Sequence, residues 1–119
     1  MAVGTLRTIP VEQGVLSLDE IKRRLTPVFE KYQVKRAYLF GSYARGEATP
    51  ESDIDIRVEK GENNEHLYSI FQASGMWQML TEFAEKEVDL LTCLPSKKYD
   101  RQFYDNVLRD EVLIYGNPI

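Results

Sequence analysis

Two aspartates, Asp53 and Asp55, interrupt an otherwise apolar run that contains Ile54 and Ile56. Uncompensated charge in such a run is costly, so the pair requires a physical explanation. Residues two apart on a strand project from the same face, which places these side chains about 6 to 7 Å apart at their bases. A divalent ion such as Mg²⁺ would relieve the repulsion between them, because it binds a few carboxylates together with substrate phosphates. The pair therefore predicts a metal site.

A third aspartate, Asp89, interrupts the apolar run 88–91 in the same way. If that run pairs beside residues 53–58, three carboxylates meet on one face of a sheet. Three carboxylates can hold two metal ions around a phosphorus atom that undergoes in-line displacement. We therefore expect Asp53, Asp55 and Asp89 to bind two Mg²⁺ ions and to form a catalytic centre.

A glycine–serine pair, Gly41 and Ser42, ends the β-prone run 35–40. A strand that ends in glycine can bring its backbone close to a ligand, and N–H groups that open a short helical turn bind oxyanions. The hydroxyl group of Ser42 would add another donor. Gly46 is expected to end this turn in a conformation denied to other residues. The pair predicts the phosphate-binding half of a nucleotide site.

The segment Gly41-Ser42-x-x-Arg45-Gly46, a short polar loop and then Ser52-Asp53-Ile54-Asp55-Ile56 together carry a family resemblance. They resemble the signature of the DNA polymerase beta type nucleotidyltransferase superfamily, most closely its minimal nucleotidyltransferase branch. The resemblance covers about residues 17–116, and Asp89 falls where that family has its third aspartate.

The resemblance implies a role for each matching residue. Gly41 and Ser42 would contact the triphosphate, and the aspartates would bind metal, with Asp89 also deprotonating or orienting the acceptor hydroxyl. Arg45 could steady the triphosphate or pair with a nearby carboxylate. Ser52 belongs to the same motif and is a further candidate for nucleotide binding. The implied reaction is transfer of a nucleoside monophosphate, usually AMP from ATP, with pyrophosphate leaving.

The resemblance also implies a partner. Larger members of the superfamily add domains that hold the base or the acceptor, whereas this chain ends almost as soon as the catalytic sheet is complete, so we expect another chain or a second copy to supply acceptor recognition. Minimal members are commonly paired with a helical partner of the HEPN type, often a ribonuclease toxin that they neutralise by modifying a tyrosine. An antitoxin role is thus the implied function.

Two other functions stay open on the sequence. Arg57 shares a strand face with Asp53 and Asp55, where it could pair with a carboxylate and compete with metal. That would leave a catalytically idle module that neutralises its partner by contact alone. The acceptor could instead be a small molecule such as an aminoglycoside. Nothing in the chain decides between acceptors.

Helical periodicity predicts part of the scaffold that must position these residues. The helical patterns cover three ranges: 18–32, 65–86 and 97–109. Ser17 and Glu20 form a capping box at the start of the first range. The second is expected to break at Ser74-Gly75, where Ser74 can cap a new helix. The buried side of that helix is expected to consist of Met76, Leu80, Phe83 and Ala84.

Strand patterns complete the predicted scaffold. Four short β-prone runs predict strands at 35–40, 53–58, 88–93 and 112–115. The order of these elements predicts an α/β (α+β) fold, a mixed β-sheet with flanking helices, as in the palm-like nucleotidyltransferase fold of the resembling family.

Length and composition narrow the remaining choices. With 119 residues and 43% hydrophobic content, the chain is expected to form one domain over residues 17–119, preceded by an arm, 1–16, without a clear period. A net charge of -4 argues against undirected nucleic-acid binding. The single cysteine, Cys93, excludes an intramolecular disulfide and a cysteine-based zinc site. The N-terminus lacks a signal peptide or membrane span, so we expect a cytoplasmic protein without membrane contact, and homo-oligomers are possible.

Overall fold

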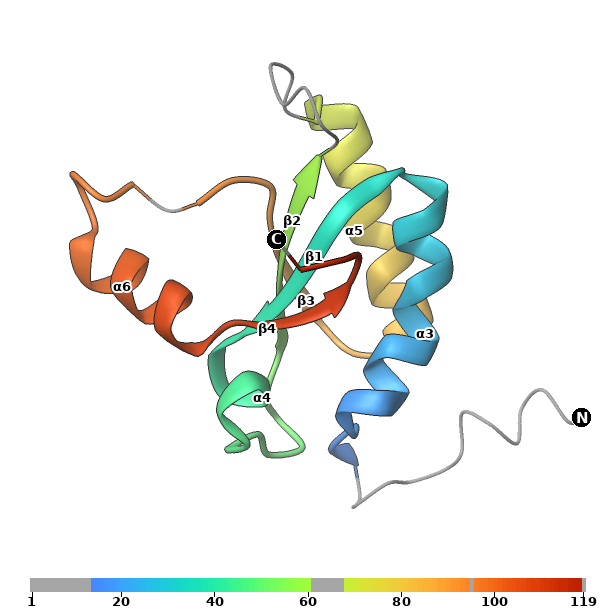
Figure 1. Ribbon diagram of the computed structural model, residues 1–119. Coiled ribbons are helices and arrows are strands. Elements are labelled where there is room, and N and C mark those ends of the chain that lie inside the picture. The colour runs from blue at the N-terminus through green and yellow to red at the C-terminus, as the bar shows by residue number, and fades with distance from the viewer. Residues whose placement is uncertain (1–13, 61–67, 95, 119) are drawn as a thin grey trace, which may run out of the picture.

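The protein is built on a four-stranded mixed sheet with the strand order β3-β2-β1-β4. The computed structural model describes residues 14–60, 68–94 and 96–118 (Figure 1). The strands are β1 (Val34–Phe40), β2 (Ile54–Lys60), β3 (Val88–Leu91) and β4 (Val112–Tyr115). β1 pairs antiparallel with both β2 and β4, whereas β2 and β3 are parallel. The predicted mixed sheet is confirmed, and β4 has the predicted bounds.

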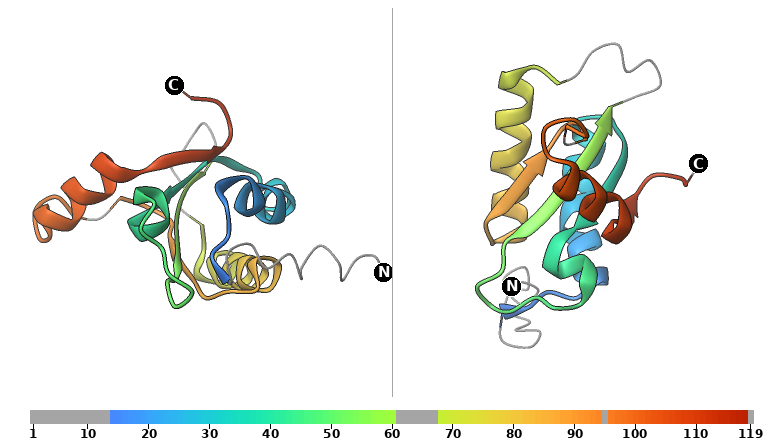
Figure 2. Two further views of the ribbon diagram at one scale, coloured as in Figure 1. Left: turned by 90° about the horizontal axis from the view of Figure 1, so that it is seen from below. Right: turned by 90° about the vertical axis from the view of Figure 1, so that its left-hand side faces the viewer.

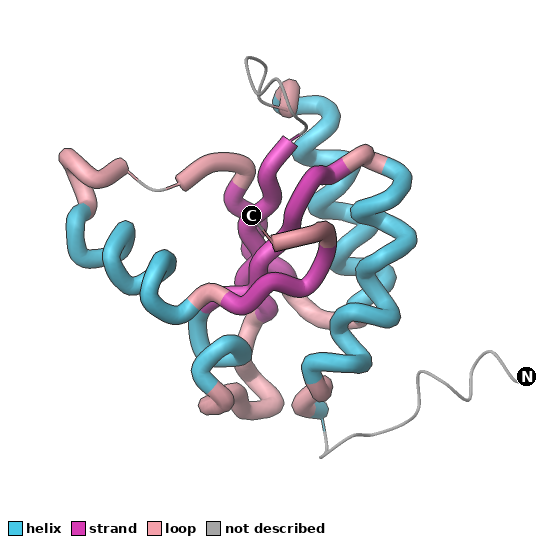
Figure 3. The backbone as a smooth tube through the Cα atoms, viewed as in Figure 1, coloured by secondary structure: helices cyan, strands magenta, loops and turns pink. Residues whose placement is uncertain are grey.

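Within the part of the chain that the structure describes, four helices flank this sheet, and they lie on two sides of it. They are α3 (Leu18–Lys31), α4 (Gly41–Arg45), α5 (Ile70–Ala84) and α6 (Arg101–Asp110). α3 and α5 cover one face of the sheet, whereas α4 and α6 lie on the other side (Figures 2 and 3). Ile54, Ile56 and Val58 of β2 are fully buried in the core with residues of α3 and α5. The alternating side chains of β2, including Asp55, consequently face away from that core.

α3 forms almost as predicted, and it is tied to α5 by a buried arginine. The hydroxyl of Ser17 accepts from the backbone N–H of Glu20 at 3.1 Å. The carboxylate of Glu20 accepts from Arg23 and Arg24 rather than completing the expected capping box. Arg24 is buried and also donates to the carbonyl oxygen of Ala84, at 2.6 Å. This contact fixes the end of α5 against α3.

The predicted break at Ser74-Gly75 is wrong, because α5 is continuous and begins at a capping box on Ser69. Residues 65–67 of the predicted helix lie outside the described residues. Gly75 serves helix packing instead: a Cβ atom there would lie 2.7 Å from the hydroxyl oxygen of Tyr32, at the end of α3. A larger residue at this position would therefore require the end of the Tyr32 side chain to move.

Two predicted details of the helices also differ from the structure. Phe83 was expected on the buried side of α5 but is 39% exposed, whereas Met76, Leu80 and Ala84 are buried. α6 begins at Arg101 rather than at residue 97, because Asp100 caps it by accepting from the N–H of Phe103.

The chain just before α3 already belongs to the core. Leu16 is buried, and its N–H donates to the hydroxyl of Tyr43 in α4 at 3.4 Å. Residues 1–13 of the predicted N-terminal arm lie outside the described residues. Among the residues that are described, no helix is long and apolar enough to cross a membrane.

Candidate active site

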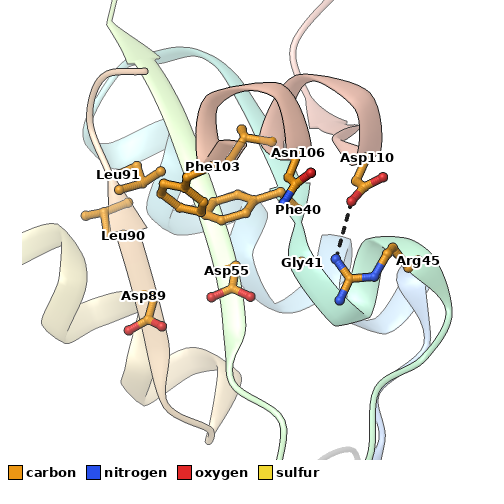
Figure 4. A pocket seen from close by; sticks show the side chains of 11 residues that line it. Phe40, Gly41, Arg45, Asp55, Asp89, Leu90, Leu91, Phe103, Asn106 and Asp110 are labelled. Carbon is orange, nitrogen blue, oxygen red and sulfur yellow. Dashed lines mark hydrogen bonds and ion pairs between the residues drawn. The ribbon is translucent and has the colours of Figure 1, made fainter. Parts of the chain in front are cut away.

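Asp55 and Asp89 lie side by side on neighbouring strands. The parallel register of β2 and β3 pairs Asp55 with Asp89, and the antiparallel register of β1 and β2 pairs Phe40 with Asp55. Since paired strands are about 4.8 Å apart, the two carboxylates project next to each other on the face away from the core (Figure 4). The strand adjacency that the sequence could only assume is thereby confirmed.

The carboxyl group of Asp55 lies in an electrostatically unfavourable place. Burial, together with the neighbouring carboxyl groups of Asp89 and Asp53, raises its pKa from an ordinary 3.8 to about 7, whereas Arg45 acts in the opposite direction. The largest of these contributions is loss of solvent, which disfavours the charged form. A cation at this point would offset both the repulsion between the carboxylates and the energetic cost of their lost solvation.

Asp53 is placed differently from the other two aspartates. It is exposed, directly precedes β2 and is absent from the residues that line the pocket around Asp55. Within residues 14–60, 68–94 and 96–118, no three His, Cys, Asp or Glu side chains form a group that could hold one metal ion. The structure thus brings Asp55 and Asp89 together, and a metal-binding role for Asp53 stays a prediction.

Gly41 forms the side of the site next to α4. It is the first residue of α4 and has a backbone φ of +73°. It directly follows Phe40, which pairs with Asp55 on the neighbouring strand. A Cβ atom at this position would collide with the carboxylate of Asp55. Glycine is therefore needed both for its backbone conformation and for the close approach. Gly46 ends α4 in the left-handed region, as predicted.

The other three predicted nucleotide-binding residues have separate positions. Arg45 lines the pocket and is bound by Glu47 at 2.9 Å and by Asp110 at 3.3 Å. Ser42 is partly exposed in the first turn of α4 and is outside the pocket lining. The hydroxyl of Ser52 accepts from the N–H of Thr49 at 2.8 Å, so it closes the turn before β2.

These elements enclose a pocket of about 510 Å³ between the sheet and α6 (Figure 4). Its lining consists of Phe40, Gly41, Arg45, Asp55, Asp89, Leu90, Leu91, Phe103, Asn106, Val107 and Asp110. Asp89, Asp55 and Arg45 lie along one side of the pocket (Figure 4). On the other side, the rings of Phe40 and Phe103 meet edge-on with centroids 6.1 Å apart. The pocket has the size of a small-molecule site with one polar and one apolar part.

Sequence reasoning missed the contribution of α6 to this pocket. Phe103, Asn106, Val107 and Asp110 all line it. They follow the spacing i, i+3, i+4 and i+7, which marks one face of a helix. That spacing is a usable signal, but the sequence alone does not indicate which surface of the sheet this helix faces.

Arg57 does not compete for the site. Its guanidinium group donates to both carboxylate oxygens of Glu111, at 2.9 and 3.1 Å, and to Glu59 at 3.0 Å. It also lies over the ring of Tyr38, 4.5 Å from the centroid. The expected pairing with carboxylates is real, but the partners are outside the pocket lining, so the sequence-based reason for suspecting an idle site no longer applies.

The donor chemistry of the pocket fits a divalent cation. Asp55 and Asp89 offer carboxylate oxygens side by side, and the raised pKa of Asp55 reflects a negative charge without adequate compensation. Mg²⁺ typically binds one or two protein carboxylates and completes its shell with water and substrate phosphates. Two facing carboxylates therefore meet the need of such an ion.

Comparison with known proteins identifies relatives of the chain. Residues 23–118 match the family of polymerase beta nucleotidyltransferases. A protein of Methanocaldococcus jannaschii named "putative protein adenylyltransferase" is 42% identical over 99 residues, which cover 82% of this chain and 93% of the relative. A second protein of that organism with the same name is 46% identical over 77 residues, covering 65% of this chain and 78% of the relative.

Solved structures share the fold at lower sequence identity. A chain of a toxin–antitoxin crystal structure with AMP-PNP has a TM-score of 0.64 and 21% identity, covering 81% of this chain and 73% of its own. A chain from the complex of a tri-AMPylated Shewanella oneidensis HEPN toxin with an MNT antitoxin has a TM-score of 0.60 and 19% identity, covering 84% of this chain and 73% of its own. At these identities the likeness establishes the fold.

Proposed function

Since this chain belongs to the polymerase beta nucleotidyltransferase family, we propose that it transfers AMP from ATP to a hydroxyl group on a partner protein. The observation that carries the proposal is the side-by-side arrangement of Asp55 and Asp89 in a pocket closed by Gly41. In this arrangement two carboxyl groups lie next to the backbone of residue 41, which can approach Asp55 so closely only because it is glycine. Both features suit the binding of a metal–phosphate group.

The two parts of the pocket suit the two parts of a nucleotide. Phosphates would lie near Gly41 and Arg45, whose guanidinium group would exchange Glu47 and Asp110 for phosphate oxygens. The base would lie between Phe103 and Leu91, because aromatic and aliphatic side chains favour the faces of a flat ring. The amide of Asn106 could hydrogen-bond to an edge of the base.

Mg²⁺ would be held by Asp55 and Asp89, where it would supply neutralisation of the phosphate charge and polarisation of the phosphorus–oxygen bonds. The residues of the chain perform the remaining tasks. The exposed carboxylate of Asp89 accepts the proton of the acceptor hydroxyl. The hydroxyl oxygen bonds to the α-phosphorus of ATP, and the bond from that phosphorus to the bridging oxygen breaks, releasing pyrophosphate. Arg45 stabilises the leaving charge.

We further propose a HEPN-type helical protein as the partner, with a tyrosine as the acceptor and an antitoxin role as the result. Two lines support this choice. The relatives that cover most of this chain are named as protein adenylyltransferases. A chain of the same fold occurs with a tri-AMPylated HEPN toxin.

The proposal is tested with ATP labelled at the α-phosphate, Mg²⁺ and the HEPN-type protein of the same organism as acceptor. The parent is expected to transfer label to the acceptor, and Asp89→Asn is expected to lower the rate by about 10²- to 10³-fold, as for loss of a general base. The control is Asp105→Asn, because Asp105 is an exposed aspartate of α6 outside the pocket lining. Equal transfer by Asp89→Asn and the control would contradict the proposal.

A further inference from the structure

An ion pair spans the candidate nucleotide pocket from α4 to α6. A guanidinium nitrogen of Arg45 lies 3.3 Å from a carboxylate oxygen of Asp110, and both residues line the pocket (Figure 4). Arg45 is the only cation among the described residues that form this lining. The positive group that would receive phosphate oxygens is therefore already bound by a carboxylate of the same chain.

Asp110 has a second partner outside the pocket lining. The side chain of Arg109 donates to both of its carboxylate oxygens, at 2.8 and 3.0 Å. If Arg45 turned to a phosphate group, Asp110 would keep this contact, and Arg45 would have the phosphate. Neither charge would be left without a partner, so the ion pair between Arg45 and Asp110 can be exchanged at little cost.

The neighbouring ion pair of Arg57 and Glu111 differs in each of these respects. The side chain of Arg57 is 5% exposed, and it donates to both carboxylate oxygens of Glu111. The side chain of Arg45 is 40% exposed and donates to Asp110 through a single bond. Exposed ion pairs are weak, whereas a guanidinium group binds phosphate through strong, frequently paired hydrogen bonds. A polyphosphate can therefore displace Asp110 from Arg45, while Glu111 still holds the end of α6 at the sheet.

We infer that Asp110 is an internal competitor of the nucleotide's phosphate groups for Arg45. The inference rests on the proposed function and adds a means of regulating the same site. Because the nucleotide must break the ion pair in order to bind Arg45, the carboxylate of Asp110 lowers the affinity for ATP. After transfer the carboxylate binds Arg45 again, which favours the departure of pyrophosphate. Asp110 thus acts through Arg45 and has no contact with the reacting atoms.

The inference is tested by titrating the full chain calorimetrically with inorganic pyrophosphate in the presence of Mg²⁺. Asp110→Asn should bind pyrophosphate about 5-fold more tightly than the parent, the fold-change that corresponds to loss of an exposed ion pair. Asp110→Ser removes the same charge and should give the same gain. A contact that merely holds α6 in place would change the affinity in the opposite direction, because its loss would loosen one wall of the pocket.

Asp105→Asn is the matched control for the change in net charge. Asp105 is also an aspartate of α6 that pairs with an arginine, Arg101, at 3.3 Å, but it is outside the pocket lining. This variant should keep the parent's affinity for pyrophosphate. In AMP transfer, added pyrophosphate should inhibit Asp110→Asn at about 5-fold lower concentration than it inhibits the parent or the control.

Three results would overturn the competitor role, whether or not AMP transfer occurs. They are an equal or weaker affinity for pyrophosphate in both Asp110 variants, an equal gain in Asp105→Asn, and a lack of pyrophosphate binding in all of these proteins. Tighter pyrophosphate binding by the Asp110 variants without any AMP transfer would support the competitor role and contradict the proposed function.

Discussion

Asp55 and Arg57 are two residues apart on the same face of β2, but only the charge of Arg57 is compensated by neighbouring side chains of opposite charge. The side chain of Arg57 is 5% exposed, receives two carboxylates, Glu59 and Glu111, and lies over the ring of Tyr38. Asp55 instead faces further carboxyl groups, and its pKa is raised to about 7. One charge is satisfied within the chain, and the other is left in a pocket.

This difference separates a structural charge from a functional one. A buried charge that the fold must retain is surrounded by opposite charge, because an unpaired one costs several kcal/mol. The strain at Asp55 has no such internal remedy, and a metal ion with its nucleotide would relieve it. The comparison therefore makes opposite predictions for the stability and the activity of variants at the two positions.

The largest expected effect is on the activity of Asp55→Asn. Loss of a preorganised electrostatic partner lowers rates by about 10²- to 10³-fold, so AMP transfer should fall by that amount. The free energy of unfolding at pH 8 should rise or stay unchanged, because a repelled carboxylate has been removed. Labelled transfer and thermal unfolding in the absence of metal measure the two quantities. A clear loss of stability would show that Asp55 is a structural residue like Arg57.

Glu111→Gln should give the converse result. It leaves the guanidinium group of Arg57 buried with Glu59 as its remaining carboxylate. Loss of a hydrogen-bonded charged partner should lower the free energy of unfolding by about 2 kcal/mol. Transfer by the folded protein should stay within a few-fold of the parent, because this pair is outside the pocket lining. Urea unfolding against the exposed control Glu30→Gln measures the loss, and equal midpoints would refute it.

Gly41→Ala sharpens the comparison from the backbone side. Gly41 and Gly46 have nearly equal φ angles, +73° and +75°, but a Cβ atom collides with Asp55 only at Gly41. A left-handed alanine costs about 1–2 kcal/mol at either position. Gly41→Ala should also displace the carboxylate of Asp55 and so lower transfer, whereas Gly46→Ala should keep it. Equal transfer rates in the two variants would show that the close approach is not needed.

The sequence predicted the local features of the site and left the long-range ones open. The alternation of β2 and the short turn after Gly41 follow from neighbouring residues, so both could be derived. The pairing of β3 with β2 joins residues 34 positions apart and had to be assumed. Glu111, which satisfies Arg57, is 54 positions away. Without it, Arg57 was interpreted as a competitor for the active-site carboxylates.

The helices show the same limit for another reason. Ser74-Gly75 has the local properties of a break, but the continuous helix of α5 is stabilised by packing on α3 and the sheet. Tertiary contact overrides a local preference of about 1 kcal/mol. The residue spacing in α6 identifies the helix face that lines the nucleotide pocket. It does not show that this face is turned towards the sheet, because that depends on where the chain turns at Asp100.

The last expected effect is a pH dependence that belongs to Asp55. Its pKa is about 7 in the folded chain and is expected near 3.8 in the unfolded chain. Between these values the folded state binds the proton more tightly, so this group lowers the free energy of unfolding as pH rises from about 4 to about 7. Below and above that window its contribution is constant. The difference between the parent and Asp55→Asn isolates it from all other carboxyl groups.

That difference is measured by thermal unfolding of both proteins from pH 4 to pH 8, first with EDTA and then with Mg²⁺. With EDTA the parent should lose stability relative to Asp55→Asn as pH rises. Mg²⁺ should restore the parent mainly above pH 7, because the ion binds the deprotonated carboxylate and thereby competes with the proton. Glu111→Gln, which removes a partner of Arg57, serves as the contrast. Mg²⁺ should raise its thermal stability by as much as it raises that of the parent, because Asp55 is unchanged in this variant. A difference curve that is flat in pH would mean that Asp55 is as well compensated as Arg57, and the distinction between the two charges would fail.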